Sequence, residues 1–123
     1  MALLTKPDVF KAGIAGAPVT FWEGYDTAYT EKYLGKPQDN PEGYQRSSTL
    51  TYVDQLHGEL FLVHGMIDEN VHFRHTARIM QALIDAGKRF ETLLYPNERH
   101  LPRSEGDRAD MERRLLEFFQ RTL

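Results

Sequence analysis

The sequence contains no cysteine, and this absence excludes several kinds of site. Disulfide bonds, cysteine-ligated zinc and a cysteine nucleophile all require thiols. A basic stripe for nucleic-acid phosphates is also missing, because 15 basic and 18 acidic side chains leave a formal charge of −3. No run of about 18 apolar residues occurs. We therefore expect neither a nucleic-acid partner nor a membrane segment in this chain.

The hydrophobic residues, 41% of a chain of 123 residues, are sufficient for a packed core. Apolar runs at residues 9–19, 60–63 and 90–95 predict short buried strands, and residues 73–87 and 107–123 predict helices. Strands that alternate with helices indicate an α/β fold with parallel strands and flanking helices. In such a fold, functional side chains gather in the loops beyond the carboxyl ends of the strands.

Three further segments complete this prediction. Residues 1–4 read as the interior of a helix that lacks an N-terminal cap, so we expect the chain to be a piece of a longer protein. Residues 35–48, rich in Pro, Gly, Asn and Ser, predict a loop, and residues 47–56 predict a short helix. The helix predicted over residues 73–87 should pack through the residues at helical spacing, which are Phe73, Ala77, Met80 and Ile84.

Two loops beyond the predicted strands carry titratable residues. Asp68 follows the strand at residues 60–63, and His100 follows the strand at residues 90–95. Since one strand-helix-strand unit of a parallel sheet returns the chain to the same end, we expect these side chains to be neighbours. A carboxylate beside an imidazole suits a general base, and this chain order is the second half of the Ser…Asp…His order of α/β-hydrolases. Asp68 is equally compatible with a plain helix cap.

A serine nucleophile is not found in the sequence. The pattern G-x-S-x-G of a nucleophile elbow does not occur. The three serines, Ser47, Ser48 and Ser104, lie in predicted loop or helix-cap positions. The chain therefore offers two of the three members of a catalytic triad.

Four aromatic residues, Trp22, Tyr25, Tyr29 and Tyr33, are separated by three, four and four positions. This spacing predicts one face of a helix or of helical turns. Such a face packs into a core in most helices, but it also suits a flat apolar pocket.

The histidines other than His100 offer few chemical roles. His64 is interpreted as a structural residue at the end of a strand, and His57 as loop surface. His72 and His75 lie three positions apart, a spacing that could bind a metal ion, but no third ligand completes the site. We therefore predict no metal and no cofactor.

Two long motifs carry a family resemblance. Residues 64–73 (HGMIDENVHF) are similar to the H-G-x-x-D-[DE]-N-V-H-F segment of dipeptidyl peptidases of the prolyl oligopeptidase family. Residues 17–33 (APVTFWEGYDTAYTEKY) resemble that family's A-P-V-[ST]-x-W-x-x-Y-D-[ST]-x-Y-T-E-[RK]-Y segment, and residues 98–100 (ERH) match the surroundings of its catalytic histidine. The resemblance covers essentially the whole chain. It implies the C-terminal portion of an α/β-hydrolase fold, with residues 1–123 as the C-terminal part of a peptidase catalytic domain.

The resemblance also implies a role for individual residues. Asp68 corresponds to the triad carboxylate and His100 to the general base. Asn70 corresponds to a side chain that hydrogen-bonds the carbonyl of the substrate's first residue. The pocket for the substrate's penultimate proline would be lined by Val19, Trp22, Tyr25, Tyr29 and Val71.

The resemblance implies a serine exopeptidase that releases N-terminal dipeptides after proline or alanine. Its nucleophile elbow and β-propeller would lie outside this chain, which alone should be inactive. The expected partners are a peptide with a penultimate proline or alanine, the missing portions of the same protein, and a second copy in a homodimer. A cytoplasmic or a periplasmic location is compatible with the sequence.

Two alternatives remain at this point. The chain could be a non-catalytic interaction module or pseudo-enzyme, because half of a hydrolase sheet leaves an unpaired edge that favours association. It could also belong to a sibling oligopeptidase or acylaminoacyl peptidase. The motif around Trp22, Tyr25 and Tyr29 argues against the sibling enzymes.

Overall fold

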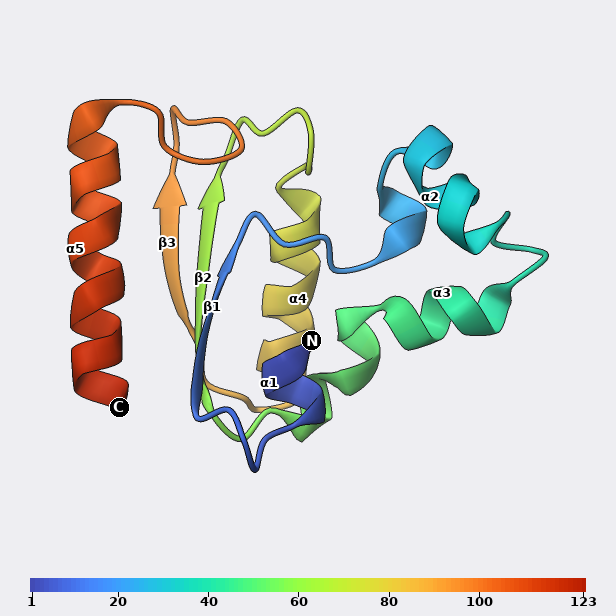
Figure 1. Cartoon of the computed structure of the whole chain (residues 1–123), viewed down its shortest axis with the longest axis horizontal. Coiled ribbons are helices and arrows are strands. Elements are labelled where there is room, and N and C mark those ends of the chain that lie inside the picture. Colours follow the sequence, from blue (N-terminus) through green and yellow to red (C-terminus); the bar gives the residue numbers. More distant parts are fainter.

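Three strands form a parallel sheet at the centre of the structure, with helices on both of its faces (Figure 1). This computed structural model describes all of residues 1–123. In chain order the elements are α1 (Ala2–Thr5), β1 (Ala12–Gly16), the 3-10 helix η1 (Trp22–Gly24), α2 (Thr27–Leu34), α3 (Pro41–Ser47), the 3-10 helix η2 (Thr49–Gln55), β2 (Glu59–Gly65), α4 (Arg74–Asp85), β3 (Glu91–Tyr95) and α5 (Glu105–Thr122).

The strands lie in the order β1-β2-β3, and both pairs are parallel. Gly16 pairs with Val63, and Gly65 pairs with Tyr95, so all three strands run toward the same end of the sheet. This carboxyl end is uppermost in Figure 1. The prediction of an α/β fold with parallel strands and flanking helices is therefore confirmed.

The central strand β2 supplies both halves of the core. Leu60 and Leu62 belong to the apolar cluster that α1, η2 and α4 complete on one face. Phe61 and Val63 pack with Phe118 of α5 on the other face. Because alternate side chains of a strand point to opposite faces, a strand covered on both sides needs a continuous apolar run. Figure 1 shows α5 on one side of the sheet and α1 and α4 on the other.

The buried face of α4 differs from the face that its apolar spacing predicts. Ile84, which should pack inward, is 57% exposed. The inward side chains are His75, Thr76, Ile79 and Leu83. His75 and Thr76 have hydrogen-bond partners inside the protein, so these two polar residues occupy core positions that an apolar pattern does not reveal.

The loop predicted over residues 35–48 contains a helix, α3. Asn40 caps this helix by accepting a hydrogen bond from the Gly43 amide at 3.1 Å. Pro41 stands in the first turn, where its missing amide hydrogen costs nothing. The residues that predicted a loop therefore act as the start signals of a short helix.

The strand predicted over residues 9–19 is shorter and less buried than expected. β1 covers Ala12–Gly16 only, and its side chains are mostly half-buried. Val9, which precedes it, is 69% exposed. The difference follows from the position of β1 at the edge of the sheet, where one side has no neighbouring strand.

Residues 17–55, which we term the insert, connect β1 to β2 away from the sheet. The insert holds η1, α2, α3 and η2 and extends to one side of the molecule (Figure 1). Hydrogen bonds join its two ends: the Thr20 carbonyl accepts from the Ser48 hydroxyl and from the Thr49 amide, both at 3.0 Å. η2 confirms the short helix predicted near residues 47–56. None of the helices has the length and apolar character that crossing a membrane requires.

Candidate active site

Two loops meet at the carboxyl end of the sheet, as the sequence predicts. One follows β2 and the other follows β3. The Met66 amide donates to the Tyr95 carbonyl at 2.9 Å, and the Ile67 amide donates to the Glu98 carbonyl at 3.2 Å. These bonds continue the parallel strand pairing into the loops, so the side chains that follow are held close together.

A glycine allows the two loops to approach closely, and a surface ion pair connects them. A Cβ atom at position 65 would lie 1.7 Å from the Arg99 carbonyl oxygen, so only glycine fits there. On the exposed side, the Arg99 guanidinium donates to the Glu69 carboxylate. Backbone packing thus sets the spacing of the loops, and the surface ion pair adds little to it.

Asp68 and His100 are in direct contact at this junction. Nδ1 of His100 lies 2.9 Å from Oδ2 of Asp68, across 32 positions of sequence. The Asp68 side chain is fully buried, whereas the His100 side chain is 43% exposed. The other oxygen of Asp68, Oδ1, accepts from the Asn70 amide at 2.8 Å and from the Val71 amide at 3.0 Å. The structure therefore brings together the pair that the sequence singled out.

A second histidine contacts the same carboxylate. Nε2 of His64 lies 3.0 Å from Oδ2 of Asp68 and 2.9 Å from the Val71 carbonyl oxygen, and Nδ1 lies 2.7 Å from the Thr76 hydroxyl. His64 is fully buried. Sequence reasoning assigned His64 a structural role and missed this contact. The sequence signal that could have indicated this contact is the position of His64 near the end of a buried strand, four residues before Asp68.

Burial and hydrogen bonding act on Asp68 in opposite directions. Burial raises the pKa of the Asp68 carboxyl, but hydrogen bonds from two histidines and two backbone amides outweigh it and hold the pKa below its usual range. The group is therefore a carboxylate at neutral pH. A buried carboxylate that accepts from Nδ1 of an imidazole orients the ring and stabilises its protonated form.

The free nitrogen of His100 defines what this site can do. With Nδ1 bonded to Asp68, Nε2 has no partner in the structure and is available to take a proton. No serine of the chain serves as its donor. The hydroxyls of Ser47 and Ser48 bond to backbone carbonyls within the insert, and Ser104 caps α5. The arrangement can serve as a general base, and none of these three hydroxyls is placed as its nucleophile.

Three aromatic side chains of the insert form a cluster beside the loops. The Trp22 ring lies 5.8 Å from Tyr25 and 6.1 Å from Tyr29, and the Tyr25 and Tyr29 rings are 5.6 Å apart. They lie on two consecutive helical elements rather than on one continuous helix, because Trp22 belongs to η1 and Tyr29 to α2. Asp26 breaks the helix between them by capping α2 through the Tyr29 amide at 2.8 Å. The spacing still brings the rings together.

One hydrogen bond joins the aromatic cluster to the Asp68 loop. The Tyr25 hydroxyl donates to Oδ1 of Asn70 at 3.0 Å. This bond leaves the amide group of Asn70 as a free donor. Val71, next in the chain, is buried, Val19 is half-buried, and Tyr29 is 50% exposed.

His75 attaches the base of the cluster to α4. Its Nδ1 accepts from the Thr20 amide at 3.3 Å, and its Nε2 lies 3.1 Å from the Gly24 carbonyl oxygen. The Arg74 guanidinium donates to the same carbonyl at 2.7 Å, and the Phe21 ring lies 4.5 Å from the imidazole. Burial lowers the pKa of His75, and the Arg74 charge lowers it further. Because both of its ring nitrogens are hydrogen-bonded, His75 has a structural role and is not a metal ligand.

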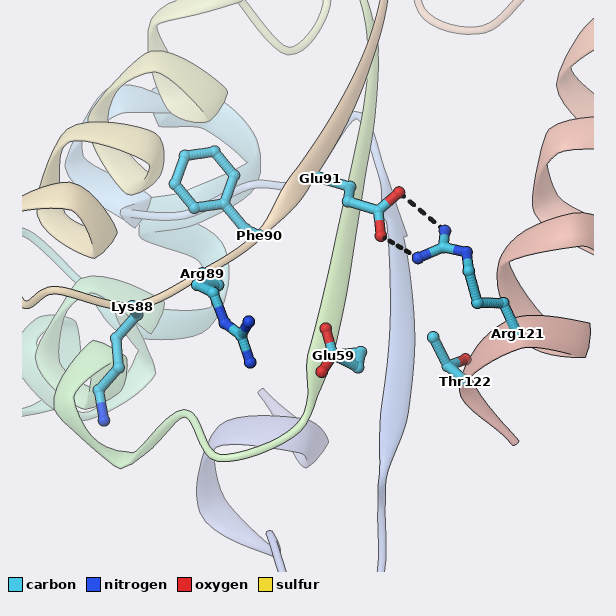
Figure 2. A pocket seen from close by; sticks show the side chains of 7 residues that line it. All are labelled: Glu59, Lys88, Arg89, Phe90, Glu91, Arg121 and Thr122. Carbon is cyan, nitrogen blue, oxygen red and sulfur yellow. Dashed lines mark hydrogen bonds and ion pairs between the residues drawn. The ribbon is translucent and has the colours of Figure 1, made fainter.

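A groove at the opposite end of the sheet has a different character. Figure 2 shows Glu91 of β3 joined to Arg121 of α5 by two hydrogen bonds, of 2.8 and 3.0 Å. The other side chains that line this groove include Glu59, Lys88 and Arg89. Glu91 and Arg121 neutralise each other, and the groove lies away from Asp68 and His100, so it is separate from the candidate active site.

Comparison with known proteins agrees with this arrangement. Residues 1–123 match the prolyl oligopeptidase family. The chain is 43% identical over 126 aligned residues to dipeptidyl peptidase 8 of Mus musculus, and this alignment covers 100% of the chain and 14% of that protein. It is 44% identical over 103 residues to dipeptidyl peptidase 4 of Bos taurus, which covers 81% of the chain and 14% of that protein.

A solved structure gives the same result for the fold. The crystal structure of Porphyromonas gingivalis dipeptidyl peptidase 4 superposes with a TM-score of 0.96 at 36% sequence identity, over 99% of this chain and 17% of that one. The fold is thus that of an α/β-hydrolase catalytic domain. The chain spans only about one seventh of the length of the relatives named above.

Proposed function

Because the chain belongs to the prolyl oligopeptidase family, we propose that it is the C-terminal part of the catalytic domain of a serine-type dipeptidyl peptidase. In this proposal, residues 1–123 supply the carboxylate and the histidine of the triad. The nucleophilic serine and a substrate-binding β-propeller belong to other portions of the same protein. The isolated chain is then inactive, since a general base without its nucleophile forms no acyl-enzyme.

The contact between His100 and Asp68 carries the proposal. Nε2 of His100 takes the proton of the serine hydroxyl as the oxygen attacks the carbonyl carbon of the substrate's second residue. The imidazolium that forms is stabilised by Asp68 and then gives its proton to the leaving amine. Water, deprotonated by the same nitrogen, hydrolyses the ester and releases a dipeptide.

The aromatic cluster suits the second residue of the substrate. A proline ring is flat and apolar, and aromatic faces form a slot that fits it or the smaller alanine. The proposed lining consists of Val19, Trp22, Tyr25, Tyr29 and Val71. The free amide of Asn70, held in place by Tyr25, donates to the carbonyl of the substrate's first residue.

The proposed partners follow from the same picture. The substrate is a peptide with proline or alanine at its second position. The complete protein contributes the nucleophile and the propeller, and we propose that it forms a homodimer. No step requires a metal or a cofactor, because His100, oriented by Asp68, performs the proton transfers.

The experiment is a kinetic comparison in the complete protein that contains this chain. Wild type should cleave a Gly-Pro reporter, and His100→Ala should lower kcat by about six orders of magnitude. His57→Ala is the matched control, since His57 is exposed and bonds only to the Gln55 carbonyl. A complete protein without peptidase activity, or one whose activity survives His100→Ala, refutes the proposal and favours an interaction module.

A further inference from the structure

We propose that His64 is a positioning residue of the site, which uses its Nε2 hydrogen to hold Oδ2 of Asp68 where that oxygen accepts from His100. The role of the Asp68–His100 pair in catalysis rests on the proposed function. The geometry of the three side chains does not.

The surroundings of His64 fix which ring nitrogen carries hydrogen. Nε2 lies 2.9 Å from the carbonyl oxygen of Val71, and a carbonyl can only accept. The same nitrogen lies 3.0 Å from Oδ2 of Asp68, which as a carboxylate also only accepts. Nε2 must therefore be protonated, and its hydrogen is shared between two acceptors.

The other nitrogen has its own partner in α4. Nδ1 lies 2.7 Å from the hydroxyl of Thr76, which can donate to it. The His64 side chain is fully buried, and the Phe73 ring packs edge-on against the imidazole at 5.7 Å between centroids. The ring is thus fixed by β2 through its backbone, by α4 through Thr76, and by Phe73 through packing.

This fixed ring limits the movement of the Asp68 carboxylate. Oδ1 is held by the Asn70 and Val71 amides, which belong to the same loop as Asp68. Oδ2 has two donors, His100 from the second loop and His64 from the sheet. His64 is therefore the donor that ties the carboxylate to the rigid core. Without it, the loop and the carboxylate could move together, and the Val71 carbonyl would lose its partner.

The substitution His64→Leu tests this role, with His64→Gln as the matched variant. Leucine fills a similar volume without a donor, so it removes the bond to Oδ2. The side-chain amide of glutamine can place an N–H near the position of Nε2 and so restore the bond. A merely space-filling role for His64 predicts equal behaviour of the two variants, whereas a positioning role predicts rescue by glutamine.

The measurement is ring-nitrogen NMR of the 123-residue chain. We expect a slowly exchanging His100 Nδ1–H signal in wild type, its loss to exchange with water in His64→Leu, and its return in His64→Gln. An unchanged signal in His64→Leu, or equal loss in both variants, overturns the inference. If His64→Leu does not fold, wild type decides: a hydrogen on Nε2 of His64 supports the inference, and its absence contradicts it.

This readout separates the inference from the proposed function. The NMR signals report hydrogen bonds and need no activity, so a complete protein without peptidase activity leaves the result intact. If the complete protein is a peptidase, His64→Leu should lower kcat more than it raises KM, because His64 is fully buried and its contact with the proposed pocket is to the backbone carbonyl of Val71.

Discussion

His100 and Asp68 are 32 positions apart in the sequence, yet Nδ1 of the first lies 2.9 Å from Oδ2 of the second. The parallel sheet accounts for this contact. β2 and β3 end side by side, and the backbone bonds between the two following loops carry the pairing as far as Asp68.

Under the proposed function, replacing Asp68 by asparagine should abolish the peptidase activity of the complete protein. The amide cannot stabilise the imidazolium of His100, and its NH₂ group would face ring nitrogens that now donate to the carboxylate. We expect kcat to fall by about four orders of magnitude in a Gly-Pro reporter assay. The conservative change Glu69→Gln, at an exposed neighbour of Asp68, should leave kcat within about twofold, because surface ion pairs contribute little. A kcat that is retained in Asp68→Asn would contradict the assigned role.

Gly65 should tolerate no side chain. In Gly65→Ala the new methyl group would overlap the Arg99 carbonyl oxygen, so the loop that bears His100 has to move. We expect a loss of about 2 kcal/mol or more in the free energy of unfolding, measured with urea on the 123-residue chain. Gly106→Ala is the control, because it faces open space in α5 and should stabilise the helix by about 0.5–1 kcal/mol. Equal stability of the two variants would show that the loops are not packed as described.

The Tyr25 hydroxyl should matter for binding more than for chemistry. Tyr25→Phe keeps the ring in the aromatic cluster but removes the donor that orients Asn70. We expect KM for a Gly-Pro reporter to rise roughly three- to tenfold, the value of one exposed hydrogen bond, with kcat little changed. Tyr33→Phe is the control, since the Tyr33 side chain is largely exposed and its hydroxyl makes no hydrogen bond. A fall in kcat without a change in KM would place Tyr25 in a different role.

The stability of the chain should depend on pH through His75. Burial holds the pKa of His75 below the usual value of about 6.5, so the unfolded state binds the proton more readily than the folded state. This contribution is fully present above pH 6.5 and is lost as the pH falls through the folded pKa. The charges of Arg74, His64 and His72 lower the pKa of His75 further, and the hydrogen bond to the Gly24 carbonyl opposes them.

Urea unfolding between pH 7 and pH 5 checks this expectation. Wild type should lose more stability over this range than His75→Gln, by no more than about 1.4 kcal/mol per pH unit, the limit for one proton. His57→Gln, at an exposed position, should follow wild type. If His75→Gln and wild type show the same slope, His75 is not the group that titrates.

Sequence reasoning located Asp68 and His100 because its evidence was topological. A buried strand, a helix and a second strand place two loops at one end of a parallel sheet whatever the details of packing. The aromatic spacing also brought Trp22, Tyr25 and Tyr29 together, although a helix cap at Asp26 separates them into two elements.

The supporting histidines could not be assigned in this way. His75 acts through Thr20 and Gly24, which lie 55 and 51 positions earlier, so its partners appear only after the insert has folded onto α4. Because His75 is buried, the inward face of α4 differs from the face that the spacing of its apolar residues predicts. His64 acts through a hydrogen bond to Oδ2 of Asp68. A pattern of residue types does not show which side-chain atoms are in contact.

The most direct test of the account is to identify the product that the complete protein releases from a peptide beginning Ala-Pro. Mass spectrometry should show the free Ala-Pro dipeptide and a shortened peptide with a new amino terminus, and Asp68→Asn should suppress both. Release of a single residue, cleavage only within the peptide, or an equal yield from the Asp68→Asn protein would contradict the assignment of this chain to a dipeptidyl peptidase.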